Sequence, residues 1–243
     1  KENIYFTVED HAQKALDKLV AQAAAQGLQA QSVVRTGSTW SELLQQMTDG
    51  KHDLVVVGTR NRSAASRTLF GSTAQRLLRT APCPVWVVKP DEVREIREIL
   101  VATDLTDACQ EVLHAGVYAA RLLQAKLFVI HSLEFPFEAY LHTAGVAPDE
   151  IGKHRRRLQQ EAQQKLDAQL EKTDCRTLKF GVKAEILPGS PDEVLPKFVA
   201  DNQIDLVVIG SHGHQGLSRM ILGNTAERLL PHVHASVLTI RSA

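Results

Sequence analysis

The sequence predicts an α/β fold, an open and mainly parallel sheet with helices on both faces, and it predicts that this fold is duplicated in the chain. Short apolar runs alternate with segments of helical periodicity, which is typical of parallel sheets whose strands are joined by helices. Spacing indicates the duplication: Gly58 and Gly210 are 152 positions apart, and so are Gly71 and Gly223. Because this repeat spacing holds over roughly fifty residues, through loops as well as apolar runs, chance similarity is a poor explanation.

The second half of the chain contains a complete set of alternating elements. Short apolar runs predict strands over 99–103, 126–131, 183–187, 205–210 and 236–241. Helices are expected over 108–123, 150–172, 191–202 and 223–232. The stretch 134–148 is long and bounded by proline, so we expect a mobile, lid-like connection there. Ser190 is expected to cap the helix that Pro191 begins.

The first half repeats only part of this plan. Its expected helix, at about 11–26, corresponds to the long helix of the second half, and its apolar run 54–57 corresponds to the strand before Gly210. Counterparts of the second half's first two strands would precede Lys1, and the chain does not begin with Met. Two explanations stay open. We favour a fragment of a longer chain, because a sheet without two central strands would expose much apolar surface; the alternative is that residues 3–8 serve as a makeshift strand.

The repeat divides the chain into two domains. A length of 243 residues has room for one large domain or two ordinary ones, and the duplication favours two. The expected boundaries are 1–90 for the first domain, 91–98 for a charged linker and 99–243 for the second domain.

Composition narrows the class of partner and the compartment. The 28 basic and 28 acidic residues balance, and no basic stripe is present, so nucleic acid is not an expected partner. No apolar stretch approaches the roughly 20 residues that span a bilayer, and no secretory signal is recognisable. The three cysteines are scattered and odd in number, which favours a reducing compartment over a disulfide framework. We therefore expect a cytoplasmic protein without a membrane partner.

A glycine motif follows the apolar run 206–209. Gly210 and Gly213 bracket a loop, and Gly223 follows after nine further residues, at the expected start of a helix. A strand that leads through a glycine loop into a helix is a usual setting for binding phosphate on backbone N–H groups. A Cβ at either loop glycine would crowd the phosphate or forbid a positive φ. The helix start adds unpaired N–H groups and about half a positive charge.

Two other residues are expected at the same edge of the sheet. Asp104 follows the strand 99–103, and Ser132 follows the strand 126–131. Ligands of open parallel sheets bind outside the carboxyl ends of the strands, where the strand order reverses. Asp104 is also a suitable acceptor for ribose hydroxyls. The pattern therefore predicts one rim that carries Asp104, Ser132 and Gly210.

These motifs resemble those of the universal stress protein family. The resemblance is carried by Asp104 with Thr106, by the Pro-Gly-Ser turn ending at Ser190, and by the motif G-x-x-G-x9-G-N/S/T from Gly210 to Asn224. The paired arrangement resembles a tandem member of the stress protein E type. The resemblance implies an adenine nucleotide alpha hydrolase-like fold with an open five-stranded parallel sheet, dimerisation through the last strand, and a stress-response function with ATP as the ligand and Mg²⁺ on its phosphates.

The resemblance also implies a role for each site residue. Asp104 would contact the adenosine near the ribose, and the backbone of Ser132 would face the adenine. The loop and the helix start would surround the phosphates through Gly210, Ser211, His212, Gly213, Gly223, Asn224 and Thr225. Asn224 stands where the family usually has Ser or Thr, so we expect weakened rather than lost binding. No catalytic residue and no metal ligand is assigned.

The first half departs further from the family pattern. Asn61 replaces the second glycine of the loop, and no counterpart of Asp104 is present. We therefore expect a degenerate structural partner rather than a second nucleotide site. The last strands of the two halves, around Trp86 and Leu238, are expected to pair, either within one chain as a pseudo-dimer or between chains.

Other functions stay open. The glycine turn could hold no ligand, and Asp104 could simply cap the following helix. A weak ATPase, or an enzyme that transfers a phosphate or adenylyl group, is an alternative, although no P-loop lysine is present. A sensor of lipid or metal, with a cavity under 134–150, is another. His212 and His214, with His232 and His234, could suggest zinc, but no Cys or carboxylate accompanies them at ligand spacing.

Overall fold

The computed structural model describes residues 2–59, 71–89, 95–135, 138–211, 226, 229 and 232–241. The chain forms two compact units, Lys1–Gln46 and Met47–Ala243. None of the helices in the described part of the chain is both long and apolar enough to cross a bilayer.

The first unit is dominated by the helix α1 (Glu2–Ala25). The helix expected at 11–26 is confirmed, and it begins earlier than the sequence indicates. The alternative of a makeshift strand over residues 3–8 is wrong, because these residues form the first turns of α1. A helix satisfies its backbone N–H and C=O groups locally, whereas an isolated strand leaves them without partners.

After α1 the chain runs back along the helix without forming a strand. Side-chain hydrogen bonds hold this return segment: Gln13 donates to Ser32 Oγ at 2.7 Å, and Thr36 Oγ1 donates to the Glu9 carboxylate at 2.7 Å. The helix α2 (Thr39–Asp49) follows.

The turn before α2 repeats in the second half of the chain. Gly37 and Gly189 both have a positive φ, +153° and +126°, and a Cβ at Gly189 would lie 2.8 Å from Val194 Cγ2. Each glycine precedes a helix of 11 residues, α2 and α7 (Pro191–Asp201), and the two helices start one repeat spacing apart. The duplicated motif therefore forms the same turn and the same helix in both halves.

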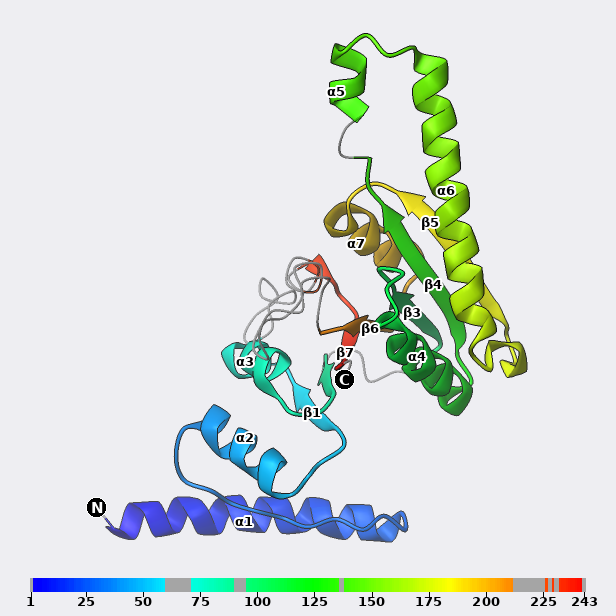
Figure 1. Cartoon of the computed structure of the whole chain (residues 1–243). Helices are drawn as coiled ribbons and strands as arrows, with labels where there is room; N and C mark the ends of the chain where they lie inside the picture. The colour runs from blue at the N-terminus through cyan, green and yellow to red at the C-terminus, as the bar shows by residue number, and fades with distance from the viewer. Residues whose placement is uncertain are drawn as a thin grey trace. The chain divides into compact units, whose positions relative to one another are not determined.

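The second unit is built on one sheet, in which seven strands are described (Figure 1). Their order is β1-β2-β7-β6-β3-β4-β5, and every neighbouring pair is parallel except β2 and β7. The strands are β1 (Val55–Gly58), β2 (Val85–Val88), β3 (Glu98–Ala102), β4 (Lys126–Leu133), β5 (Val182–Pro188), β6 (Leu206–Gly210) and β7 (Ser236–Ile240). The strands expected in the second half are thus confirmed, and β1 and β2 of the first half continue the same sheet.

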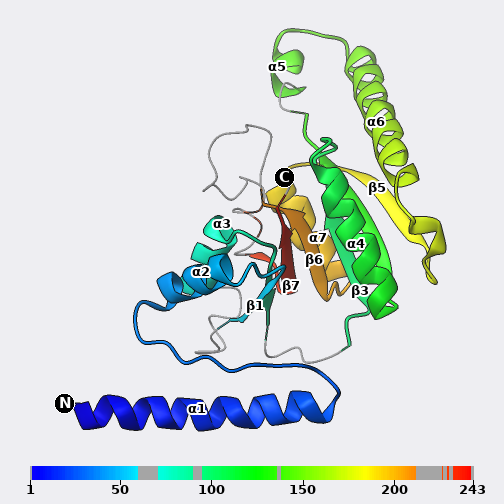
Figure 2. The same ribbon diagram turned by 60° about the horizontal axis from the view of Figure 1, so that its bottom comes forward.

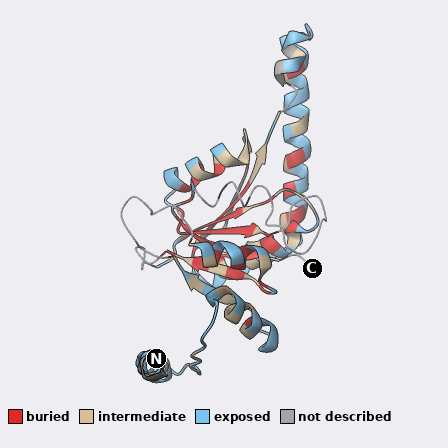
Figure 3. Cartoon of the chain, turned by 90° about the vertical axis from the view of Figure 1, so that its left-hand side faces the viewer, coloured by how far each residue is buried: buried red, intermediate tan, exposed pale blue. Residues whose placement is uncertain are grey.

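Helices cover both faces of the sheet, as the sequence predicts (Figure 2). On one face, α4 (Cys109–Leu123) and α6 (Pro148–Glu171) pack with β3, β4 and β6 in a core that includes the fully buried Leu113 and Leu166. On the other face α7 packs on β4, where the rings of Phe128 and Phe198 meet edge to face at 5.4 Å. Figure 3 shows the buried residues concentrated in the central strands and on the inner sides of these helices.

Some expected details differ in the structure. The connection expected over 134–148 contains a short helix, α5 (Glu138–Thr143). Ser190 occupies the N-cap position of α7, but its side chain makes no capping bond; its backbone oxygen instead accepts from the Glu193 N–H at 3.2 Å. The expected helix 223–232 lies mostly outside the described residues.

The two halves meet where β2 pairs with β7 in antiparallel register. Trp86 lies opposite Leu238, and these two residues are one repeat spacing apart, so each half presents the same position to the other. Two basic side chains bond across this seam: Arg241 donates to the Ala81 carbonyl oxygen at 2.7 Å, and Lys89 Nζ donates to that of Val233. The two donors, Arg241 and Lys89, are one repeat spacing apart, and so are the two acceptors, Val233 and Ala81. The expected pairing of the last strands within one chain is therefore confirmed, and the seam has a local two-fold symmetry.

Candidate functional site

The strand order reverses between β3 and β6. From β3 the chain continues to β4 and β5 on one side, while β6 and β7 lie on the other. Val101 pairs with Val208, so β3 and β6 end close together at the same edge of the sheet. The structure therefore brings Asp104, Ser132 and Gly210 to the carboxyl edge, and Asp104 and Gly210 flank the point where ligands of such sheets bind.

Asp104 organises the turn that follows β3. Its Oδ1 accepts hydrogen bonds from the Thr106 N–H at 3.0 Å, from Thr106 Oγ1 at 2.5 Å and from Cys109 Sγ at 2.9 Å. The N-cap position of α4 is Ala108, which has no side-chain capping bond. Asp104 thus stabilises the turn ahead of the helix rather than capping the helix itself.

The residue after Asp104 has a conformation that is rare for its type. Leu105 has φ +60°, in the left-handed region, where a residue with a Cβ is less stable by about 1–2 kcal/mol. Its N–H donates to Thr103 Oγ1 at 3.1 Å. The surroundings therefore hold the turn in a conformation that it would not adopt alone, and they fix the direction of Asp104.

Cys109 is a structural thiol in this turn. It is buried, and burial, followed by the hydrogen bond to the Asp104 carboxylate, raises the pKa of the Cys109 thiol to about 11. The thiol is therefore protonated at neutral pH and acts as a donor to Asp104. A thiol with so high a pKa is a poor nucleophile, so Cys109 supports the turn and does not carry chemistry.

Two residues at the end of β4 complete the described rim. His131 Nδ1 lies 2.8 Å from the Thr103 carbonyl oxygen, so with Nδ1 protonated the imidazole donates to the residue before Asp104. Ser132 pairs with Leu187 of β5 and is half-buried. Its backbone lies at the carboxyl edge, where the family resemblance implies contact with the adenine.

The described part of the glycine motif consists of Gly210 and Ser211. Gly210 pairs with Ile240 of β7, and the Ser211 N–H donates to the Ile240 carbonyl oxygen at 2.9 Å. The Ser211 amide therefore belongs to the sheet and is already used. The other expected phosphate ligands lie outside the described residues; they are His212, Gly213, Gly223, Asn224 and Thr225, and Asn61 of the first half lies outside them too.

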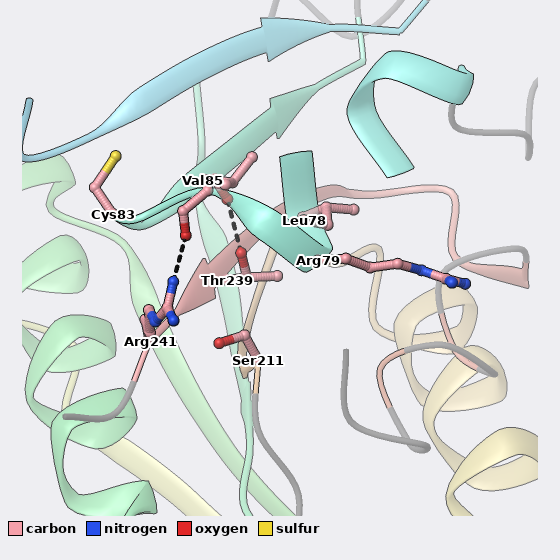
Figure 4. Close-up of a pocket in the computed structure, with 8 residues that line it drawn as sticks. Leu78, Arg79, Cys83, Val85, Ser211, Thr239 and Arg241 are labelled. Atoms are coloured by element: carbon pink, nitrogen blue, oxygen red, sulfur yellow. Dashed lines mark hydrogen bonds between the residues drawn. The ribbon is translucent and has the colours of Figure 1, made fainter. Parts of the chain in front are cut away.

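A pocket at the seam includes Ser211 among its lining residues (Figure 4). Arg241 bonds to Ala81, and Thr239 Oγ1 donates to the Val85 carbonyl oxygen at 3.3 Å, while Arg79 points away from Arg241. These hydrogen bonds join the two halves, so they belong to the seam rather than to a ligand site. The lining residues are Leu78, Arg79, Ala81, Cys83, Val85, Ser211, Thr239 and Arg241.

Across the described ranges, no three His, Cys, Asp or Glu residues are grouped so that they could hold a metal ion. Of the four histidines considered above, His232 and His234 are described, whereas His212 and His214 are not.

Sequence reasoning missed the side chain that holds the Asp104 turn from the opposite side, Gln169 of α6. Its amide contacts both Thr103 and Thr106. A signal was present, because Gln169 lies three positions after Leu166 on the apolar side of a helix on which Gln159, Gln160 and Gln164 are exposed. A polar residue in such a stripe has to find partners across the interface.

The chain is similar to known proteins in family, sequence and structure. The model of the universal stress protein family matches residues 4–89 and 95–241. Universal stress protein E of Escherichia coli strain K12 is 28% identical over 219 residues, which cover 86% of this chain and 67% of the relative. Universal stress protein E of Salmonella typhi is 29% identical over 205 residues, covering 82% and 64%. The chain spans about two thirds of the length of these relatives.

Solved structures show the same fold. A functionally unknown protein from Pseudomonas aeruginosa PAO1 superposes with a TM-score of 0.70 at 23% identity, over 95% of this chain and 78% of its own. A universal stress protein from Archaeoglobus fulgidus DSM 4304 superposes with a TM-score of 0.68 at 18% identity, over 100% and 80%. At these identities the likeness concerns the fold alone.

Proposed function

Because the chain belongs to the universal stress protein family, we propose that it is a tandem stress-response protein whose second half binds ATP and responds to its occupancy. The observation that carries this proposal is the pre-formed Asp104 turn, held at the point of strand-order reversal beside Gly210. The proposed domains are 1–90 and 99–243, with a linker over 91–98.

The proposed binding mode assigns one part of the nucleotide to each part of the rim. The Asp104 carboxylate accepts from a ribose hydroxyl, and the backbone at Ser132 faces the adenine. The glycine loop and the following helix start surround the phosphates. Mg²⁺ is held mainly by phosphate oxygens and water, since this ion needs few protein ligands in nucleotide sites.

The first half is proposed to support the site rather than to duplicate it. Its β1 ends like β6: the Thr59 N–H donates to the Val88 carbonyl oxygen at 3.0 Å, the counterpart of the bond from Ser211 to Ile240. Its loop differs, because Asn61 stands where the second half has Gly213, and β1 is the edge of the sheet in the part of the chain that is described. The half contributes β2 to the seam.

The seam also constrains self-association. The side of β7 that faces away from β6, through which the family resemblance implies dimerisation, is already paired with β2 of the same chain. A homodimer of this chain would therefore use another surface. A native mass spectrum of the full chain tests this, since it reports oligomeric state and bound nucleotide together.

Calorimetry on the full chain tests ATP binding. We expect saturable binding of ATP with Mg²⁺ and a loss of affinity of about 10- to 100-fold in Asp104→Asn, because one carboxylate oxygen becomes an NH2 group, which cannot accept a hydrogen bond from a ribose hydroxyl. This variant keeps an oxygen that can accept from Thr106 and Cys109, so the turn is preserved. The matched control is Asp107→Ala, which removes an exposed carboxylate from the same turn and should leave affinity unchanged.

Two outcomes would reject the proposal. One is the absence of both co-purified adenine nucleotide and saturable binding at millimolar ATP; the other is equal affinity in Asp104→Asn and the wild type. Gly213→Trp, which the motif predicts to block the phosphate position, should abolish binding. ATP hydrolysis is followed in the same samples, and turnover that survives Gly213→Trp comes from a contaminant rather than from this chain.

A further inference from the structure

Gln169 is a polar side chain in an apolar environment. It lies on the inner side of α6, next to the fully buried Leu166, and is itself only 6% exposed. The exposed Gln164 lies on the same helix. Burying an amide is unfavourable unless its groups are hydrogen-bonded, so the position of Gln169 requires an explanation from its partners.

The partners of Gln169 lie on both sides of Asp104. Its Nε2 donates to the Thr106 carbonyl oxygen at 2.8 Å, and its Oε1 lies 3.5 Å from Thr103 Oγ1 as an acceptor. Its backbone oxygen accepts from Gln110 Nε2 of α4 at 3.2 Å. One side chain from α6 thus bridges the residues before and after the strained Leu105, and the backbone of the same residue is bonded to α4.

We propose that Gln169 is a positioning residue for the ribose-binding carboxylate of Asp104, an inference that rests on the proposed ATP site. Without Gln169 the turn is expected to relax, because Leu105 is in an unfavourable left-handed conformation. The Asp104 bonds to Thr106 and Cys109 act within the turn. Gln169 ties the turn to a different element, and therefore sets where the turn as a whole lies relative to the sheet edge.

A purely structural role makes a different prediction from a positioning role. If Gln169 only satisfies buried groups, its loss lowers the stability of the protein but leaves the ligand preference of the folded protein unchanged. If it positions Asp104, its loss reduces the contribution of the ribose hydroxyls in particular. ATP and 2′,3′-dideoxy-ATP distinguish the two roles, because they differ only in those hydroxyls.

The test uses calorimetry on the full chain, well below the unfolding temperature, with Gln169→Leu and the control Gln164→Leu. We expect Gln169→Leu to bind ATP about five- to tenfold more weakly than the wild type does. Its affinity for dideoxy-ATP should lie within about twofold of the wild-type affinity for that nucleotide. Gln164→Leu should match the wild type for both nucleotides. Gln169→Leu combined with Asp104→Asn should bind ATP no more weakly than Asp104→Asn alone, because both changes remove the same contact.

Equal weakening of both nucleotides in Gln169→Leu, or no change in either, would overturn the inference. Gln169→Met serves where the leucine variant does not fold, since it keeps the length of the side chain and loses the donor to Thr106; the same selective loss is expected. Hydrogen exchange of residues 103–109 in the ligand-free chain separates the two proposals. If wild-type protein binds no ATP, the proposed function fails, and faster exchange in Gln169→Leu than in Gln164→Leu still supports positioning of the turn, whereas equal exchange overturns it.

Discussion

Replacing Gly116 with alanine tests how closely α4 lies on the sheet. Gly116 is buried on the inner side of α4, and a Cβ placed there would lie 2.2 Å from Cγ2 of Val101 on β3. Val101 is fully buried and β-branched, so its methyl group cannot rotate away without leaving its preferred rotamer. The helix or the strand therefore has to shift, and α4 begins directly after the Asp104 turn.

The magnitude follows from two opposing effects. Overpacking of a tight core position costs about 1–3 kcal/mol, whereas alanine is favoured over glycine in a helix by about 1 kcal/mol. The free energy of unfolding should therefore fall by up to about 2 kcal/mol in Gly116→Ala. Gly152→Ala on α6 is the matched control, because its Cβ would meet only Arg156 Nη1, at 3.9 Å. There the helix propensity acts alone and should stabilise the protein by about 0.5–1 kcal/mol.

Urea unfolding of both variants measures the two free energies beside the wild type. Opposite signs are the expected result, and equal slopes of the transitions would show that the unfolded states are comparable. If Gly116→Ala were as stable as Gly152→Ala, the close approach of α4 to β3 would be disproved, and with it the placement of the turn that α4 supports.

Two further predictions concern the seam and the buried thiol. Arg241→Ala and Lys89→Ala each remove a hydrogen bond from a charged donor across the seam, so each should lower the free energy of unfolding in urea by about 1–2 kcal/mol. Arg97→Ala, at an exposed side chain, should stay within about 0.5 kcal/mol of the wild type. A seam variant as stable as Arg97→Ala would contradict a stabilising role of these two bonds. The pKa of Cys109 is raised in the folded state from 9.0 to about 11, so its contribution to stability is fully present below about pH 9 and is lost as the pH rises toward 11. Between pH 8 and pH 10.5, the free energy of unfolding should fall less in Cys109→Ala than in the wild type. An identical fall in both proteins would refute the raised pKa of the Cys109 thiol.

The secondary structure was largely predictable because its signals are local. The apolar run at 126–131 and the helical spacing over 108–123 depend on residues a few positions apart, and both elements formed as expected, as β4 and α4. The helix α5 was missed because it is short and lies in a stretch that reads as a connection. The N-cap position of Ser190 was predictable, but its backbone rather than its side chain makes the bond.

The candidate site was predictable as a position but not as an arrangement. Asp104 follows from the motif and from its place after a strand. The bonds that orient it involve Gln169, which donates to a residue 63 positions earlier, and no local pattern connects the two. Likewise, nothing in the glycine motif shows that the Ser211 amide belongs to the ladder with β7.

The sequence by itself determined the duplication, the alternation of strands and helices, and the family, because periodicity and repeat spacing are properties of the chain order. Only the tertiary structure decided that β2 and β7 join both halves into one sheet, with Trp86 opposite Leu238, and that a buried amide from α6 holds the Asp104 turn. The physical reason is that unpaired strand edges and buried polar groups must be satisfied by whichever segments the fold brings beside them. Those segments are distant in the chain, so their identity is settled only when the chain is folded.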